Sequence, residues 1–134
     1  MATFRLHIVT PEGTFHDDEI DLLVVRTSEG NVGIKKHHID YVAKVDIGKI
    51  EIIKGKQKTY AAITDGILLV DQEKTTILTR AAERPEDIDM RRAEEAKQRA
   101  EKVMQSCKRD DIEYKIAELK LKKALNRIDL KKNP

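Results

Sequence analysis

The sequence has no tryptophan, a single cysteine and few aromatic residues. These scarcities limit the classes of function that the chain can have. Aromatic residues make up 4% of the chain, so base-stacking platforms for nucleic acid are poorly supplied. Cys107 has no cysteine partner, which excludes an internal disulfide and fits a reducing compartment. No apolar run approaches the roughly 18 residues of a membrane helix, and no signal peptide is expected. We therefore expect membrane association only through partners.

Signatures of catalysis and metal binding are also absent. No nucleophile stands in a motif with a base, and no glycine-rich phosphate loop ending in Lys-Ser/Thr occurs. His37 and His38 are adjacent, so in a strand they would point to opposite faces. His7 and His16 fall in separate predicted strands. We expect no catalytic residue and no metal site, and hence no enzyme active site.

Charge is divided unevenly along the chain. The net charge is +2, but residues 1–84 carry −1 and residues 85–134 carry +3. Neither part is the polycationic arm that nucleic acid attracts, so no nucleic-acid partner is predicted.

Residues 1–84 have the pattern of β-strands. Phe4, Leu6 and Ile8 alternate with polar neighbours, as in a strand with one buried face. Short apolar runs recur between glycine-containing turns, which favours an antiparallel β-sandwich. The Asp65-Gly66 pair separates two such runs and predicts a tight β-hairpin.

Residues 85–134 have the pattern of two helices. Pro85, Glu86 and Asp87 suit the first turn of a helix, and Asp110-Asp111 suits the cap of a second. Apolar stripes predict an antiparallel hairpin: Ala93, Ala96, Ala100, Val103 and Cys107 on the first helix, and Tyr114, Ala117, Leu121, Ala124 and Ile128, widened by Ile112, Ile116 and Leu119, on the second. Wet faces carry the i,i+4 pairs Glu95/Arg99, Asp111/Lys115 and Glu118/Lys122. Alanine buries little area, so this hairpin is expected to be marginal and able to exchange partners.

An ordered set of short segments resembles the epsilon subunits of bacterial rotary ATP synthases. The segments run from Leu6–Gly13 through Val24–Gly30, Gly33-Ile34, His38, Ile47–Ile50, Thr64–Val70 and Thr75–Leu78 to Ala82–Asp89. No single segment is specific, but their order, followed by a helical hairpin, covers nearly the whole chain.

The resemblance implies a non-catalytic rotor subunit that couples proton flow to ATP synthesis. It implies a sandwich of about ten strands in residues 1–84, docked on the gamma subunit and the membrane c-ring, with Asn31 and His38 at these contacts. It implies that the hairpin of residues 85–134 either folds up or extends toward the alpha and beta subunits, inhibiting ATP hydrolysis. The location implied is peripheral, on the cytoplasmic side of the cell membrane. Lys35-Lys36 and Asp40 depart from the usual loop, which has Leu-Pro and a later proline.

The segment Ile88-Asp89-Met90-Arg91-Arg92-Ala93 resembles the motif of epsilon subunits that bind ATP as a regulatory ligand, with Mg²⁺ as the accompanying ion. Asp89, Arg92 and Arg99 project from one helix face, and arginine can fork onto phosphate oxygens. The family pattern often has arginine where Lys123 stands and can have arginine where Ile116 stands, so both are departures. The site implied by the resemblance comprises Glu83, Ile88, Asp89, Arg92, Ala93, Arg99, Lys123 and Arg127.

Other interpretations stay open at this point. The motif could be an ordinary solvated helix face, since charged residues commonly pair along a helix. The chain could also be a free-standing basic helical-hairpin binding module without nucleotide sensing. The scarce aromatic residues and the near-neutral net charge argue against this alternative.

Overall fold

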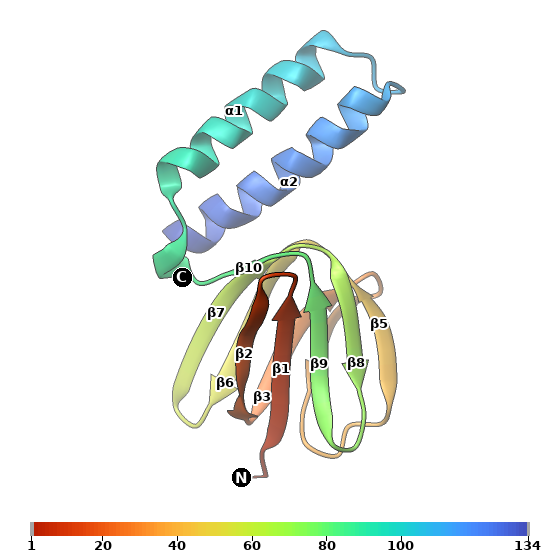
Figure 1. The fold of residues 1–134 in the computed structure, drawn as a ribbon, viewed down its shortest axis with the longest axis vertical. Coiled ribbons are helices and arrows are strands. Elements are labelled where there is room, and N and C mark those ends of the chain that lie inside the picture. The colour runs from red at the N-terminus through yellow and green to blue at the C-terminus, as the bar shows by residue number, and fades with distance from the viewer. Residues whose placement is uncertain (1, 134) are drawn as a thin grey trace. The chain divides into compact units, whose positions relative to one another are not determined.

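The computed structural model describes residues 2–133 and confirms the predicted order of strands followed by helices (Figure 1). The chain divides into two compact units at the Arg84–Pro85 bond. The first unit holds the strands, whose bounds are β1 (Phe4–Thr10), β2 (Gly13–Ile20), β3 (Leu22–Thr27), β4 (Gly30–Ile34), β5 (Tyr41–Val45), β6 (Gly48–Lys54), β7 (Gln57–Ile63), β8 (Gly66–Val70), β9 (Lys74–Thr79) and β10 (Ala82–Glu83).

The strands join in the order β10-β7-β6-β3-β5-β8-β9-β1-β2, with β4 paired to β3. The pairs are antiparallel except β1 with β9, which run parallel and so depart from the all-antiparallel prediction. Leu6 and Ile8 of β1 are fully buried, as the alternating pattern predicts. They pack in one core with residues from both halves of the strand order, including Leu23, Ile50 and Ile77.

The predicted hairpin at Asp65-Gly66 is wrong. The strands on either side, β7 and β8, do not pair with each other, because β7 pairs with β6 and β10 while β8 pairs with β5 and β9. Gly66 is needed for close packing instead. A Cβ atom there would collide with the carbonyl oxygen of Leu78 on the neighbouring strand.

The second unit holds the 3₁₀ turn η1 (Pro85–Asp87) and the helices α1 (Met90–Ser106) and α2 (Ile112–Lys132). Helix α1 begins later than predicted, because Pro85 and its acidic neighbours form η1. Asp89 then caps α1, its carboxylate accepting a hydrogen bond from the backbone N–H of Arg92. Asp111 occupies the cap position of α2 without a capping bond and accepts from the backbone N–H of Lys108 instead.

Alanine dominates the buried face of the hairpin, as the sequence predicts. Ala93 and Ala100 of α1 and Ala117 and Ala124 of α2 are buried, together with Ile128 and Leu130 near the end of α2. Leu130 was outside the predicted stripe. The predicted widening of that stripe is wrong: the side chains of Ile112, Ile116 and Leu119 are exposed.

The hairpin is antiparallel, so the end of α2 returns to the start of the unit. The Lys131 ammonium donates a hydrogen bond to the carbonyl oxygen of Pro85 at 3.0 Å. Neither helix within residues 2–133 combines the length and apolar character needed to cross a membrane.

Candidate functional site: the groove of the helical hairpin

A hollow of about 590 Å³ lies between α1 and α2. That volume falls within the range of ordinary small-molecule sites. Alanines from both helices supply its apolar floor, since small side chains leave space between the helix axes. Its lining residues are Ala96, Arg99, Ala100 and Val103 of α1, and Glu113, Ile116, Ala117, Lys120, Lys123, Ala124 and Arg127 of α2.

The structure brings together three of the predicted ATP-binding residues. Arg99 of α1 and Lys123 and Arg127 of α2 line the same hollow. Arg99 lies three residues after Ala96, and Arg127 lies three residues after Ala124, so the helix repeat places each of these cations on a face adjoining an alanine of the floor. An anionic ligand in this hollow would meet cations from both helices.

The predicted pair between Glu95 and Arg99 is wrong. Glu95 pairs with Arg91, whose Nε lies 3.1 Å from its carboxylate oxygen. Arg99 has no ion pair within residues 2–133, so its guanidinium is available to a ligand. Likewise, no ion pair joins Asp111 to Lys115 or Glu118 to Lys122 in the described part of the chain.

The motif residues at the start of α1 contribute to the local structure of the helix. One carboxylate oxygen of Asp89 accepts from the backbone N–H of Arg92 at 3.2 Å, and the other lies 3.8 Å from Arg92 Nε. Ile88 and Ala93 are buried. Arg92 is exposed and lies one turn before Ala96, so it extends the Ala96–Arg99–Val103 face of α1 toward the helix start.

Glu83 belongs to the sandwich unit, whereas the other predicted ATP-binding residues belong to the helical unit. It belongs to β10 in the sandwich unit, where it pairs with Ala62 of β7. Its predicted role in ATP binding stays a prediction.

Sequence reasoning missed Lys120 as a lining residue of the hollow. The signal was available, because Ile116, Lys120, Lys123 and Arg127 follow each other at four-, three- and four-residue steps on one face.

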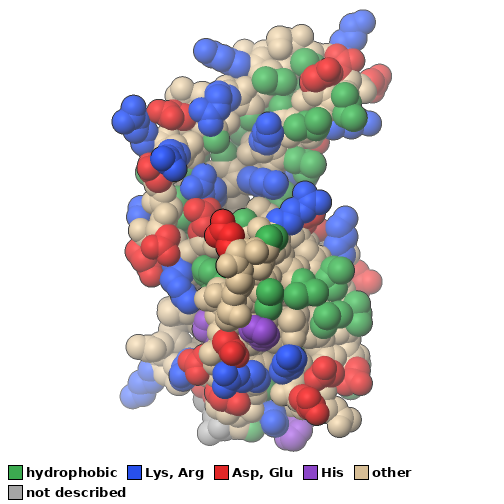
Figure 2. Space-filling view, viewed as in Figure 1, with side chains coloured by type: hydrophobic (Ala, Val, Ile, Leu, Met, Phe, Trp, Pro, Cys, Tyr) green, Lys and Arg blue, Asp and Glu red, His purple; other side chains and the backbone are tan. Residues whose placement is uncertain are grey.

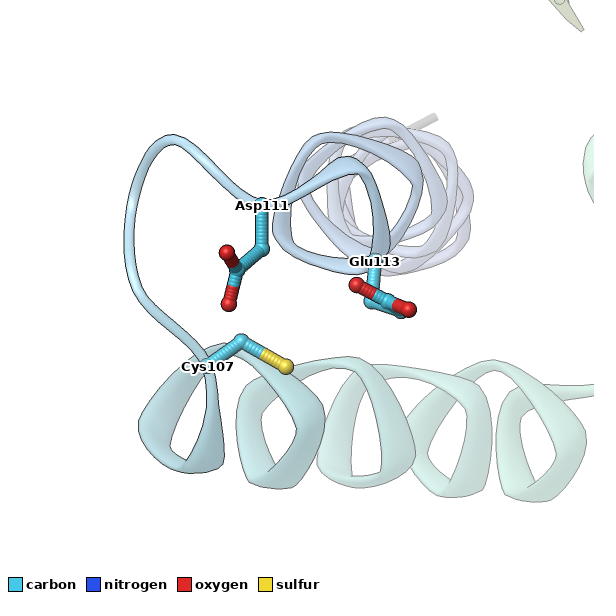
Figure 3. A group of neighbouring side chains, drawn as sticks. All are labelled: Cys107, Asp111 and Glu113. Carbon is cyan, nitrogen blue, oxygen red and sulfur yellow. The ribbon is translucent and has the colours of Figure 1, made fainter.

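The turn between the helices gathers the lone thiol and two carboxylates (Figure 3). One ligand atom from each of Cys107, Asp111 and Glu113 lies within 4.8 Å of the others. Asp111 is already engaged, because its carboxylate accepts from the backbone N–H of Lys108 at 3.0 Å. The hydrogen bond between Lys108 and Asp111 closes the turn, and no other observation within residues 2–133 indicates a bound ion.

The predicted contact residues of the sandwich lie on exposed segments. Asn31 is exposed in β4. His38 lies in the loop between β4 and β5, where its ring makes a T-shaped contact with the ring of Tyr41. This loop, which includes Lys35 and Lys36, lines a second hollow of about 750 Å³ together with the β8–β9 turn. Their contacts with partner subunits stay predictions.

The outer face of β5, β8 and β9 carries an apolar patch that the sequence analysis did not single out. Val42 opposes Leu69, and Ile67 opposes Leu78, so these four side chains share one face. They are 70%, 36%, 46% and 42% exposed, respectively. Figure 2 shows hydrophobic side chains gathered on this part of the sandwich. Patches of this kind commonly mark protein–protein contacts.

Comparison with known proteins covers both units. Residues 3–85 match the family model of the β-sandwich domain of the ATP synthase delta/epsilon chain, and residues 86–132 match that of its long α-helix domain. The ATP synthase epsilon chain of Alkaliphilus metalliredigens is 50% identical over 132 residues, covering 98% of each chain. That of Halalkalibacterium halodurans is 41% identical over 130 residues, covering 97% of this chain and 98% of the relative.

A solved structure has the same fold at lower sequence identity. A chain in the Euglena gracilis mitochondrial ATP synthase assembly of OSCP, F1 and c-ring is 23% identical. It superposes with a TM-score of 0.80 over 94% of this chain and 79% of that one. The matches to both family models and to full-length relatives show that the chain belongs to the ATP synthase delta/epsilon chain family.

Proposed function

We propose that the chain is a central-stalk subunit that restrains ATP hydrolysis in a bacterial ATP synthase through its helical hairpin, and that ATP bound in the hairpin groove controls this restraint. Membership of the delta/epsilon family carries the first part: the chain is a non-catalytic subunit of that enzyme. The observation that carries the second part is the alanine-floored groove, where Arg99, Lys123 and Arg127 converge from two helices.

The groove suits a nucleotide. Its cations can bind phosphate oxygens, with arginine able to use two donors at once. The Asp89 carboxylate, at the start of α1, can accept from an amino or hydroxyl donor of the base or ribose. A ligand that contacts both helices binds the folded hairpin better than a separated pair of helices. Its binding therefore stabilises the folded hairpin by mass action.

The buried face of the hairpin supports movement. Its buried residues are mainly alanines, and each buried alanine contributes little apolar area. At high ATP the hairpin would stay folded and permit hydrolysis. At low ATP it would open and contact the catalytic subunits, and hydrolysis would slow.

The sandwich provides the attachment to the other central-stalk subunits. We assign the apolar patch of Val42, Ile67, Leu69 and Leu78 to the gamma subunit, because burying it would remove exposed apolar area from water. The loop with His38 and the exposed Asn31 are assigned to the c-ring. Attachment to these partners would hold the chain at the membrane.

The test is hydrolysis by the reconstituted enzyme with the whole chain or with residues 86–134 removed. We expect the truncated chain to bind gamma, since the sandwich has its own core, and hydrolysis to rise at low ATP. Unchanged hydrolysis with gamma still bound would refute the regulatory role.

A further inference from the structure

We propose that Lys120 is a further ligand-binding residue of the groove and that it contacts the terminal phosphate of ATP. This inference rests on the proposed ATP site and adds a specific role to it. Lys120 lines the hollow with Arg99, Lys123 and Arg127. Within residues 2–133 it has no ion pair, so its ammonium group is not committed to a carboxylate.

The cations of α2 form a row along the groove. Arg127, Lys123 and Lys120 follow at four- and three-residue steps, which place them on one face over about 10 Å of helix. Such a row fits an extended polyanion better than a single phosphate group. The ligand class indicated is therefore a nucleoside polyphosphate.

The direction of the hairpin orders this row. The hydrogen bond from Lys131 to the Pro85 carbonyl places the end of α2 beside the start of the unit. Arg127 consequently lies toward the Asp89 end, and Lys120 lies toward the turn between the helices. Beyond Lys120 the groove is lined by Val103, Ile116 and the carboxylate of Glu113. Lys120 is thus the last cation of the row.

The position of the last cation determines which phosphate it meets. The Asp89 carboxylate repels phosphate and can accept from base or ribose donors, so the nucleoside belongs at that end. The phosphates then extend along Arg99 and Lys123, and the third phosphate reaches Lys120. ADP lacks this group, so Lys120 contributes to the preference for ATP over ADP.

Calorimetric titration of the full chain with ATP, ADP and AMP tests this role. K120Q should weaken ATP binding about fivefold, as expected for a solvent-exposed ion pair, weaken ADP binding less, and leave AMP binding unchanged. K120R, which keeps the charge, should bind ATP nearly as well as the unmodified chain. K122Q is the matched control, because Lys122 is exposed and does not line the hollow.

Three results would overturn the role: K120Q binding ATP as the unmodified chain does, an equal loss for all three nucleotides, or an equal loss in K122Q. The last two would indicate a general effect of charge. If the unmodified chain gave no heat with ATP, the proposed ATP site would itself fail. Binding by the unmodified chain without an effect of K120Q would refute the assignment of Lys120 alone.

Discussion

Asp89 accepts a hydrogen bond from the backbone N–H of Arg92 at 3.2 Å, so a motif associated with ATP is also the N-terminal cap of α1. A capping carboxylate satisfies a backbone donor that would otherwise have no partner in the helix. Loss of function on changing Asp89 could therefore come from an unravelled helix start or from a lost ligand contact.

Two substitutions separate these roles. D89N keeps a good capping side chain and removes the charge, so we expect little change in the free energy of unfolding. D89A removes both and should destabilise the hairpin by about 1 kcal/mol. If the carboxylate contacts ATP, calorimetry should show weaker binding in both variants. Full ATP affinity in D89N would restrict Asp89 to its capping role.

Gly66 should tolerate no side chain. Its Cβ would collide with the Leu78 carbonyl oxygen and lie 3.0 Å from Thr79 Cα. We expect G66A to lower the free energy of unfolding by about 2 kcal/mol, because the backbone of β8 or β9 must shift. G33A is the matched control, since the nearest atom to its Cβ would be Leu22 Cδ1 at an ordinary 3.7 Å. Urea denaturation measures both, and equal stabilities would contradict this explanation.

Lowering the pH should reduce the stability of the sandwich, because His16 becomes protonated. Burial, aided by the charge of Arg84, holds the pKa of His16 below its usual 6.5. His16 Nε2 is buried and has no hydrogen-bond partner among residues 2–133. The folded state therefore binds this proton less readily than the unfolded chain. The stability contribution is complete above pH 6.5 and is lost as pH falls through the lower, folded-state pKa.

Substituting His16 should remove this part of the pH dependence. Between pH 7.5 and 5.5 the urea midpoint of H16Q should fall less than that of the unmodified chain. Asp17 and Asp18 become protonated only at lower pH. Hydrogen bonds donated by Arg5 and Lys54, respectively, hold the pKa values of these carboxylates below 3.8. Parallel pH dependence in both proteins would remove His16 from the explanation.

The apolar patch should govern association with gamma. V42E places a charge in the patch at a position that is already 70% exposed, so stability should change by no more than about 1 kcal/mol. Binding to gamma should fall at least about tenfold, because a carboxylate would be buried in an apolar contact. T59E, on the exposed part of β7, is the control. Retention of gamma by V42E in a pull-down would place the contact elsewhere.

Periodicity predicted the elements better than their connections. The alternation of Phe4, Leu6 and Ile8 requires one buried face and therefore predicts a strand. Asp65-Gly66 has the composition of a hairpin turn, but β7 and β8 pair with other strands. Glycine serves there because another backbone approaches closely, and a local sequence cannot distinguish that need from a turn.

The sequence predicted the cations of the candidate site better than it predicted the shape of the hollow. The resemblance indicated Arg99, Lys123 and Arg127, and the structure places them around one hollow. The spacing places Lys120 on the same helix face as Lys123 and Arg127, but only the packing of α2 against α1 shows that this face lines the hollow. The Glu95 pair was assigned to Arg99 rather than Arg91 because both partners satisfy the same four-residue spacing.

The most direct test of the proposed ATP site is residue-resolved NMR of the full chain during ATP titration. An ATP site between the helices predicts saturable shifts in the backbone amides of Ala96, Arg99, Ala100, Lys123 and Ala124, with smaller changes in the sandwich strands. The same shifts should weaken in a variant with both Arg99 and Arg127 changed to alanine. Absence of shifts at millimolar ATP, or shifts confined to the sandwich, would contradict an ATP site between the helices.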